Sequence, residues 1–184
     1  MTRLSVFLSA ASLLVIVQVT HAQTRYAARN GFIGFYSKTP LEDITAENNQ
    51  AFAIIDTVQK NLAFAVLMKG FIFRKELMQE HFNENYVESD KYPKAEFSGS
   101  YSCSRPMNKP GVYPITVRGN LTLHGVTKMI EEPATLEIRE NSILGNANFN
   151  LKPEDFEITI PGIVRDKIDK EINVRIRITW STQK

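Results

Sequence analysis

The segment ITVRGNLTLH, Ile115 to His124, alternates along its whole length between apolar or glycine positions and polar positions. One parity holds Ile115, Val117, Gly119, Leu121 and Leu123, and the other holds Thr116, Arg118, Asn120, Thr122 and His124. Because successive side chains of a strand point to opposite faces, this pattern predicts a strand with one dry and one wet face. At about 3.3 Å per residue the strand would span roughly 30 Å, which is long for a globular protein.

The same period of two recurs on both sides of this segment. It is clearest in residues 171–180, where Ile176, Ile178 and Trp180 share one face. Shorter alternating stretches cover residues 62–68, 94–101, 135–139, 146–151 and 156–160, and weaker ones cover 31–38 and 51–57. Turn-forming residues separate them, and no helices alternate with them as a parallel sheet would require. We therefore predict an all-β fold, an antiparallel up-and-down barrel of about eight strands, because closure removes exposed strand edges.

One stretch breaks this pattern. In residues 73–89, FRKELMQEHFNENYVES, Leu77, Met78, His81 and Phe82 recur at the spacing of one helical stripe. We expect one short amphipathic helix of about three turns, which lies against the barrel wall or caps an opening.

The N-terminus has the features of an export signal. Arg3 precedes an apolar run from Leu4 to Val19, and Thr20 and Ala22 then place small residues three and one positions before Gln23, as at a secretory cleavage site. We expect residues 1–22 to be a signal peptide, residues 23–184 to form one domain, and the protein to be exported, either periplasmic or secreted. The run is too short and too polar for a membrane-spanning helix, so we expect no integral membrane segment after its removal.

Composition excludes several classes of partner. The whole chain has 22 basic and 20 acidic side chains, and this balance gives no field that would attract nucleic acid. Its single cysteine, Cys103, cannot form an intrachain disulfide, so burial alone must stabilise the fold. The oligomeric state stays open, with a dimer among the possibilities.

Two motifs point to a family. The stretch from Gly119 to Lys128 reads GNLTLHGVTK, and upstream of it Asp90 to Phe97 reads DKYPKAEF. In this order they resemble the YceI family, which pairs G-x-L-T-L-H-G-V-T-K with D-x-x-x-Y-P-x-x-x-F. The resemblance implies an extended, lipocalin-like barrel whose apolar interior can hold a polyisoprenoid or another long-chain amphiphile. Many relatives carry an R-D-x-H-L element before D-F-F-D, and in residues 73–86 the acidic and histidine residues are placed differently.

The apolar faces define a candidate lipid-binding interior. Its predicted lining residues are Phe64, Val66, Met68, Phe97, Leu121, Leu123, Ile176, Ile178 and Trp180. They would form either a filled core or the wall of a tunnel for an alkyl or prenyl chain. The resemblance favours the tunnel, whereas the few residues between the first strand and Asp56-Thr57 favour a shorter wall, with a smaller cavity or none. Arg175, Arg177 and Lys128 would contact a polar headgroup or form a solvated outer face.

Two residues are candidates for the rim of the barrel. We expect His124 to finish a strand, with its ring hydrogen-bonded to neighbouring backbone and Gly125 permitting a tight approach. A ligand contact at the mouth is the alternative. Tyr92, held extended by Pro93, would deliver the chain into the next strand or line the entrance.

No pattern indicates catalysis. The sequence has no G-x-S-x-G and no H-E-x-x-H, and we expect no catalytic residue, no metal site and no cofactor. The sequence thus favours a non-enzymatic, exported lipid-binding barrel. The alternative is a filled barrel that acts as an extracytoplasmic protein-interaction or stress-related module without bound lipid.

Overall fold

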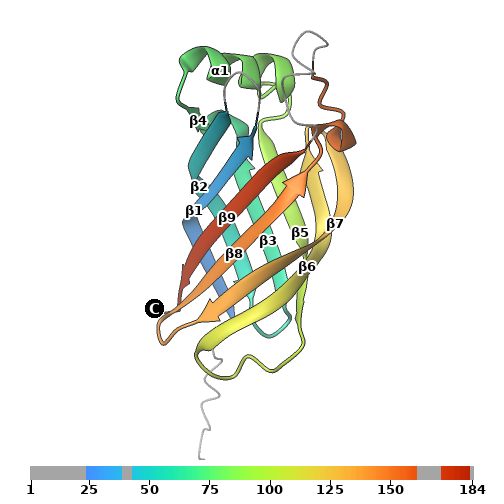
Figure 1. Ribbon diagram of the computed structural model, residues 1–184. Coiled ribbons are helices and arrows are strands. Elements are labelled where there is room, and N and C mark those ends of the chain that lie inside the picture. The colour runs from blue at the N-terminus through green and yellow to red at the C-terminus, as the bar shows by residue number, and fades with distance from the viewer. Residues whose placement is uncertain (1–23, 39–42, 161–170, 183–184) are drawn as a thin grey trace, which may run out of the picture.

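The computed structural model describes residues 24–38, 43–160 and 171–182, and in these ranges the chain forms an antiparallel barrel (Figure 1). Its strands are β1 (Arg25–Ser37), β2 (Ile44–Asp56), β3 (Asn61–Leu67), β5 (Lys94–Cys103), β6 (Gly111–Leu123), β7 (Val126–Ile138), β8 (Ser142–Leu151) and β9 (Ile172–Ser181). The two-residue strand β4 (Ile72–Phe73) pairs with β2 at the edge. The predicted signal peptide, residues 1–22, lies outside the described ranges.

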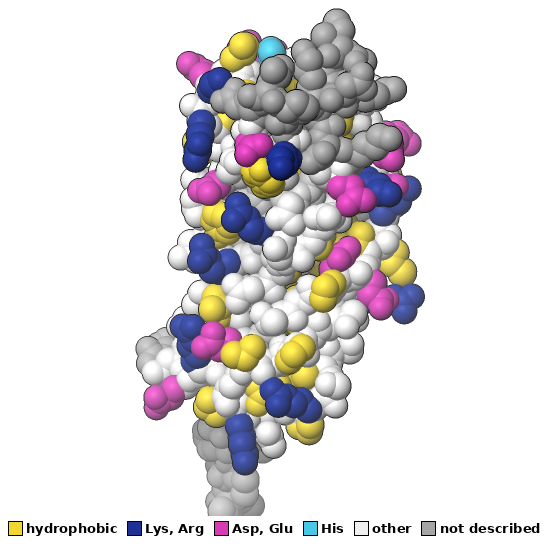
Figure 2. Space-filling view, in the orientation of Figure 1, with side chains coloured by type: hydrophobic (Ala, Val, Ile, Leu, Met, Phe, Trp, Pro, Cys, Tyr) yellow, Lys and Arg dark blue, Asp and Glu magenta, His cyan; other side chains and the backbone are white. Residues whose placement is uncertain are grey.

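The strands follow one another around the barrel in sequence order, and β1 pairs with both β2 and β9 to close it. Every pairing between neighbouring strands is antiparallel. The predicted all-β, up-and-down barrel of about eight strands is therefore confirmed. The outer surface carries basic and acidic side chains that are interspersed across the visible face (Figure 2), in line with the nearly balanced charge.

The N-terminal wall is longer than the sequence indicates. β1 and β2 have 13 residues each, so the expectation of a shorter wall was wrong. Their pairing contains irregularities between Ala28 and Gly31 and between Gly31 and Ile33. Each bulge shifts the inward parity by one residue, so the alternation breaks although the strand continues. The buried Asn48 supports this region, because its side chain donates to Leu67 O at 3.0 Å and accepts from Gln50 N at 2.8 Å.

The hairpin of β6 and β7 is the longest continuous pairing, from Gly111 with Ile138 to Leu123 with Val126. Its turn consists of His124 (φ 51°) and Gly125 (φ 75°), both left-handed, as two-residue hairpins prefer. The predicted strand at 135–139 is thus only the last part of β7. β8 pairs with β7 over Ala134–Ile138 alone.

One predicted strand is absent. Residues 153–156 form a 3₁₀ turn (Pro153–Phe156), and Ile158 follows it outside any strand. The apparent alternation of residues 156–160 arises because Phe156 and Ile158 are both buried while Glu157 between them adopts a left-handed conformation (φ 57°). Buried residues in a turn can imitate the period of a strand over so short a stretch.

The predicted helix is present. α1 (Glu76–His81) continues into a π-helical segment (Phe82–Tyr86), and Figure 1 shows it across one end of the barrel, beside β4. Met78, His81 and Phe82 line the space inside the barrel. Leu77 does not belong to this stripe, because it is 61% exposed.

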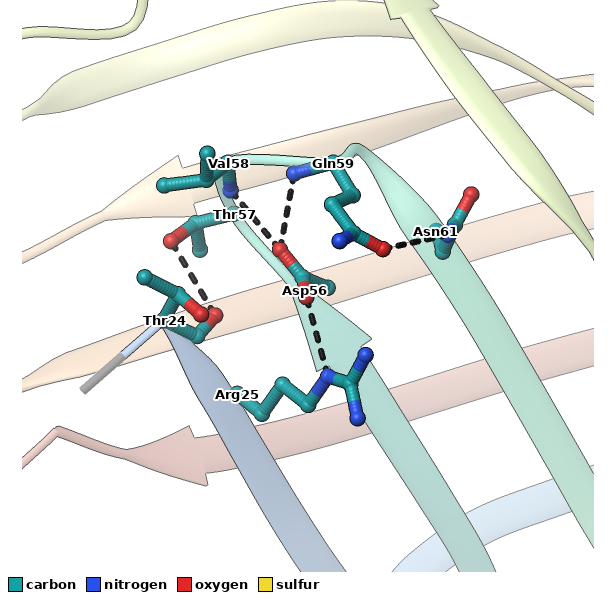
Figure 3. Close-up of polar contacts among 7 residues, drawn as sticks. All are labelled: Thr24, Arg25, Asp56, Thr57, Val58, Gln59 and Asn61. Atoms are coloured by element: carbon teal, nitrogen blue, oxygen red, sulfur yellow. Dashed lines mark hydrogen bonds and ion pairs between the residues drawn. The ribbon is translucent and has the colours of Figure 1, made fainter.

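The opposite end of the barrel is held by polar contacts in the turn between β2 and β3 (Figure 3). Asp56 Oδ1 accepts from Val58 N at 3.0 Å and from Gln59 N at 2.8 Å, and Oδ2 accepts from Arg25 Nε at 3.0 Å. The N–H of Gln59 above all, together with Arg25 and the N–H of Val58, holds the pKa of Asp56 below its usual value although burial opposes the shift.

A candidate ligand cavity inside the barrel

The interior of the barrel is hollow towards the end that carries α1. The cavity has a volume of ≈ 510 Å³, within the usual range for small-molecule sites of about 300–1,000 Å³. Side chains of the inward parity of the strands line most of it, and helical residues such as Met78 and Phe82 add to the wall. Nearly all of these side chains are apolar, so the cavity suits an apolar occupant better than water.

The floor of the cavity is a packed cluster at the other end of the barrel. Its buried members are Ala28, Ala53, Ile55, Tyr101, Ile115, Leu136, Ile143, Ile178 and Trp180. The indole of Trp180 is 2% exposed and its Nε1 donates to Ala53 O at 3.1 Å. Gly145 lies against this ring, since a Cβ there would come within 2.8 Å of it. The interior is therefore a pocket that is closed at the floor rather than an open channel.

All nine side chains that the sequence predicts as interior lining lie along this cavity: Phe64, Val66, Met68, Phe97, Leu121, Leu123, Ile176, Ile178 and Trp180. Eight of them come from β3, β5, β6 and β9, and Met68 comes from the 3₁₀ turn Met68–Gly70 that follows β3. The Phe97 ring covers the cross-strand pair of Gly99 and Gly119, where a Cβ on either glycine would lie within 2.8 Å of it. Contact of these nine residues with a lipid stays a prediction.

A group of aromatic side chains lies at the α1 end of the cavity. Phe35, Phe71, Phe73 and Phe82 pack in tilted and edge-on pairs with ring centroids 5.0–5.7 Å apart. They come from β1, the segment after β3, β4 and the helical segment. None of the four was predicted as a site residue, and only Phe82 stands in a regular pattern, the helical stripe of residues 73–89. Phenylalanines in three separate segments carry no shared periodicity by which they could be recognised.

His124 and Tyr92 make structural contacts at this same end of the barrel. His124 Nδ1 is 3.1 Å from Phe156 O, and Nε2 is 2.9 Å from Glu88 Oε2. The Tyr92 ring stands edge-on to the imidazole, with centroids 4.5 Å apart, and lies against Gly125, where a Cβ would be 2.6 Å from it. Neither side chain is among those that line the cavity. Their role as a ligand rim stays a prediction.

A few polar side chains interrupt the apolar wall, among them His81, Thr135 and Asn146, and two others, Ser37 and Glu132, bear on the chemistry of the site. Ser37, at the end of β1, is 2% exposed, and its Oγ has no hydrogen-bond partner among the described residues. Glu132, in the middle of β7, lines the cavity, and burial raises the pKa of its carboxyl. Arg175, Arg177 and Lys128 are exposed on the outer face, so they are a solvated surface and do not line the interior.

Within the described ranges, no group of three or more histidine, cysteine or acidic side chains is arranged to hold a metal ion. Among the same residues, no helix has both the length and the apolar character that crossing a membrane requires. The site therefore consists of an apolar cavity, an aromatic end and one carboxylate in its wall.

Comparison with known proteins agrees with this geometry. A model of the YceI-like domain family matches residues 14–180. A UPF0312 protein of Pseudomonas putida (strain W619) is 32% identical over 96 residues, which are 49% of this chain and 47% of that protein. The matched part thus spans about half the length of this curated relative.

Solved structures share the fold at low sequence identity. A polyisoprenoid binding domain from Saccharophagus degradans, implicated in plant cell wall breakdown, superposes with a TM-score of 0.73 at 12% identity, over 86% of this chain and 98% of that one. BcnA of Burkholderia cenocepacia gives 0.69 at 13% identity, over 81% and 95%. A YceI protein of Campylobacter jejuni gives 0.56 at 14% identity, with each chain covered in full.

Proposed function

The chain belongs to the YceI-like domain family, and from this premise we propose that it is a non-enzymatic, exported protein that holds a polyisoprenoid or a similar long-chain amphiphile inside its barrel. The observation that carries the proposal is the ≈ 510 Å³ apolar cavity closed at one end by the Trp180 cluster. A filled barrel, the alternative, would place packed side chains in this space.

The physical chemistry of the cavity favours a chain-like apolar ligand. An empty cavity forfeits packing contacts that an occupant restores. A chain that buries about 300 Å² of apolar surface would gain about 7.5 kcal/mol, before the costs of association, at about 25 cal/mol per Å². Affinity should therefore grow with the length of the buried chain and respond little to salt, since the wall holds few charges.

The similar fold of a polyisoprenoid binding domain supports the choice of ligand class. The sequence of residues 1–22 supports export. N-terminal sequencing of protein from a host that exports it tests the second point, and a mature chain that still begins at Met1 would contradict it.

The binding proposal is tested on protein purified from such a host, by native mass spectrometry followed by organic extraction. We expect an extractable long-chain lipid. Leu121→Asp, which places a charge on the cavity wall, should remove it, and Asn120→Asp, on the exposed face of the same strand, should not. Circular dichroism of both variants checks that the barrel is folded. A folded wild-type protein that carries no lipid and takes up none would refute the proposal.

A further inference from the structure

Glu132 is a carboxylate in an apolar wall. Its neighbours on the same face of β7 are Ile130 and Ala134, and its partner across the β6–β7 hairpin is Val117. All three neighbours line the same cavity as Glu132 itself. A charged side chain in this position costs stability unless something compensates it.

The described part of the protein does not supply that compensation. Adjacent Glu131, which points outward, lies 3.6 Å from Arg118 Nε, and Glu88 lies 2.9 Å from His124. No ion pair or hydrogen bond joins the Glu132 side chain to any described residue. The raised pKa of its carboxyl agrees with partial loss of water around it. A hydrogen-bond partner for half-buried Glu132 must therefore come from water or from another molecule in the cavity.

The identity of the occupant then matters. A purely hydrocarbon chain that fills the cavity expels water and leaves the carboxylate without a partner, which costs binding free energy. A chain that carries a hydroxyl or an ammonium group at this depth donates a hydrogen bond and avoids that cost. A site built to bind a donor group in this way rejects analogues that lack it. A phosphate beside Glu132 would be repelled, because both groups are anionic.

We propose that Glu132 is a specificity-determining residue that accepts a hydrogen bond from a hydroxyl or ammonium group of the bound amphiphile. Its negative charge would also exclude anionic headgroups from the part of the cavity beside it. This inference rests on the proposed function, since it concerns the same cavity.

The test compares three probes of one chain length: hexadecanol, hexadecylamine and methyl hexadecyl ether, which lacks a donor. Affinities for the wild-type protein, Glu132→Leu and Glu132→Gln are measured by isothermal titration calorimetry. The emission of Trp180, which is the only tryptophan and lines the cavity, serves as a second readout. Glu131→Leu is the matched control, because it removes the neighbouring carboxylate from the outer face of the same strand.

We expect the wild-type protein to bind the alcohol and the amine about tenfold or more tightly than the ether, the effect of one hydrogen bond to a charged group. Glu132→Leu should abolish this preference, and Glu131→Leu should keep it. Glu132→Gln should keep the preference for the alcohol and lose any additional affinity for the amine, because the amide still accepts a hydrogen bond but carries no charge.

Equal affinity of the wild-type protein for all three probes overturns the inference and leaves the lipid-binding proposal standing. A preference that survives in Glu132→Leu also overturns it. Failure of the folded wild-type protein to bind any of the probes overturns both. Thermal unfolding of each variant shows that it is folded, and we expect Glu132→Leu to be at least as stable as the wild-type protein, since it removes a charge from an apolar wall.

Discussion

Replacing Ala147 by phenylalanine distinguishes a hollow interior from a filled one by the sign of the change in stability. Ala147 lies in β8 between Ala134 of β7 and Ile176 of β9, and all three line the cavity. A phenylalanine here would project into the ≈ 510 Å³ space and pack against the apolar wall. Ala147→Phe would therefore reduce the space for a ligand and at the same time stabilise the folded protein.

The magnitude follows from the area that the new ring buries. Full burial of a phenylalanine side chain gains about 1.5–3 kcal/mol relative to an exposed one. The gain is smaller here, because alanine already buries some apolar surface at this position and the new ring stays partly accessible from the cavity. We therefore expect an increase of about 1–2 kcal/mol in the free energy of unfolding. For a chain of this length that corresponds to a rise of about 3–6 °C in Tm.

Denaturant unfolding of the ligand-free protein measures the stability, and titration with a long-chain alcohol measures binding. Ala63→Phe is the matched control, because Ala63 is exposed on the outer face of β3 and pairs with Ile54 and Ser98. It should change stability little and leave binding intact. Ala147→Phe should bind the chain at least tenfold more weakly.

A filled interior would give the opposite result. A phenylalanine forced into a packed core costs about 1–3 kcal/mol, because neighbouring side chains leave their preferred rotamers. Destabilisation of that size in Ala147→Phe, with Ala63→Phe neutral, would show that the barrel has no cavity in solution. The proposed function would fail with it.

Three further changes test other parts of the structure. Gly145→Val should cost about 1–3 kcal/mol of unfolding free energy and shift the emission of Trp180, because its Cβ would stand 2.8 Å from the indole; unchanged stability in a urea titration would contradict the contact. The lowered pKa of Asp56 stabilises the fold above about pH 4, and this contribution is lost as the pH falls through the folded-state value. Asp56→Ala should thus be less stable at pH 7 and decline less steeply in acid, and parallel acid unfolding curves would refute this. The pKa of Glu132 is raised, so its ionised carboxyl destabilises the fold at neutral pH. Glu132→Gln should therefore be more stable than the wild-type protein at pH 7, and this gain should vanish below about pH 4, where the carboxyl is protonated in both states. A gain that persists at pH 3 would contradict this explanation.

The wall of the barrel could be predicted because its signal is local. In β6 and β9 each side chain faces the interior or the solvent according to its position in a period of two, and the structure keeps that parity from Ile115 to Leu123. The same rule failed in β1 and β2, where bulges near Gly31 shift the parity midway. A bulge depends on the partner strand, so the pattern of one strand does not reveal it.

Glu132 shows how a site residue escaped detection. The alternation of residues 135–139 continues backwards through Ala134, Glu132 and Ile130, which puts the carboxylate on the apolar parity. The proline at 133 and the charges at 131 and 132 make this part of the sequence look like a loop, whereas its pairing with β6 keeps it a strand. The His124–Glu88 contact joins residues 36 positions apart, and neither local sequence indicates the other.

In β3, β5, β6 and β9 the sequence by itself determined which side chains face inward, because alternation along a regular extended strand is a property of neighbouring residues. Only the tertiary structure decided that these side chains leave an empty space above Trp180, since hollowness depends on how side-chain volumes from all the strands add up around one axis. The tertiary structure also placed one carboxylate of β7, that of Glu132, on the wall of this space.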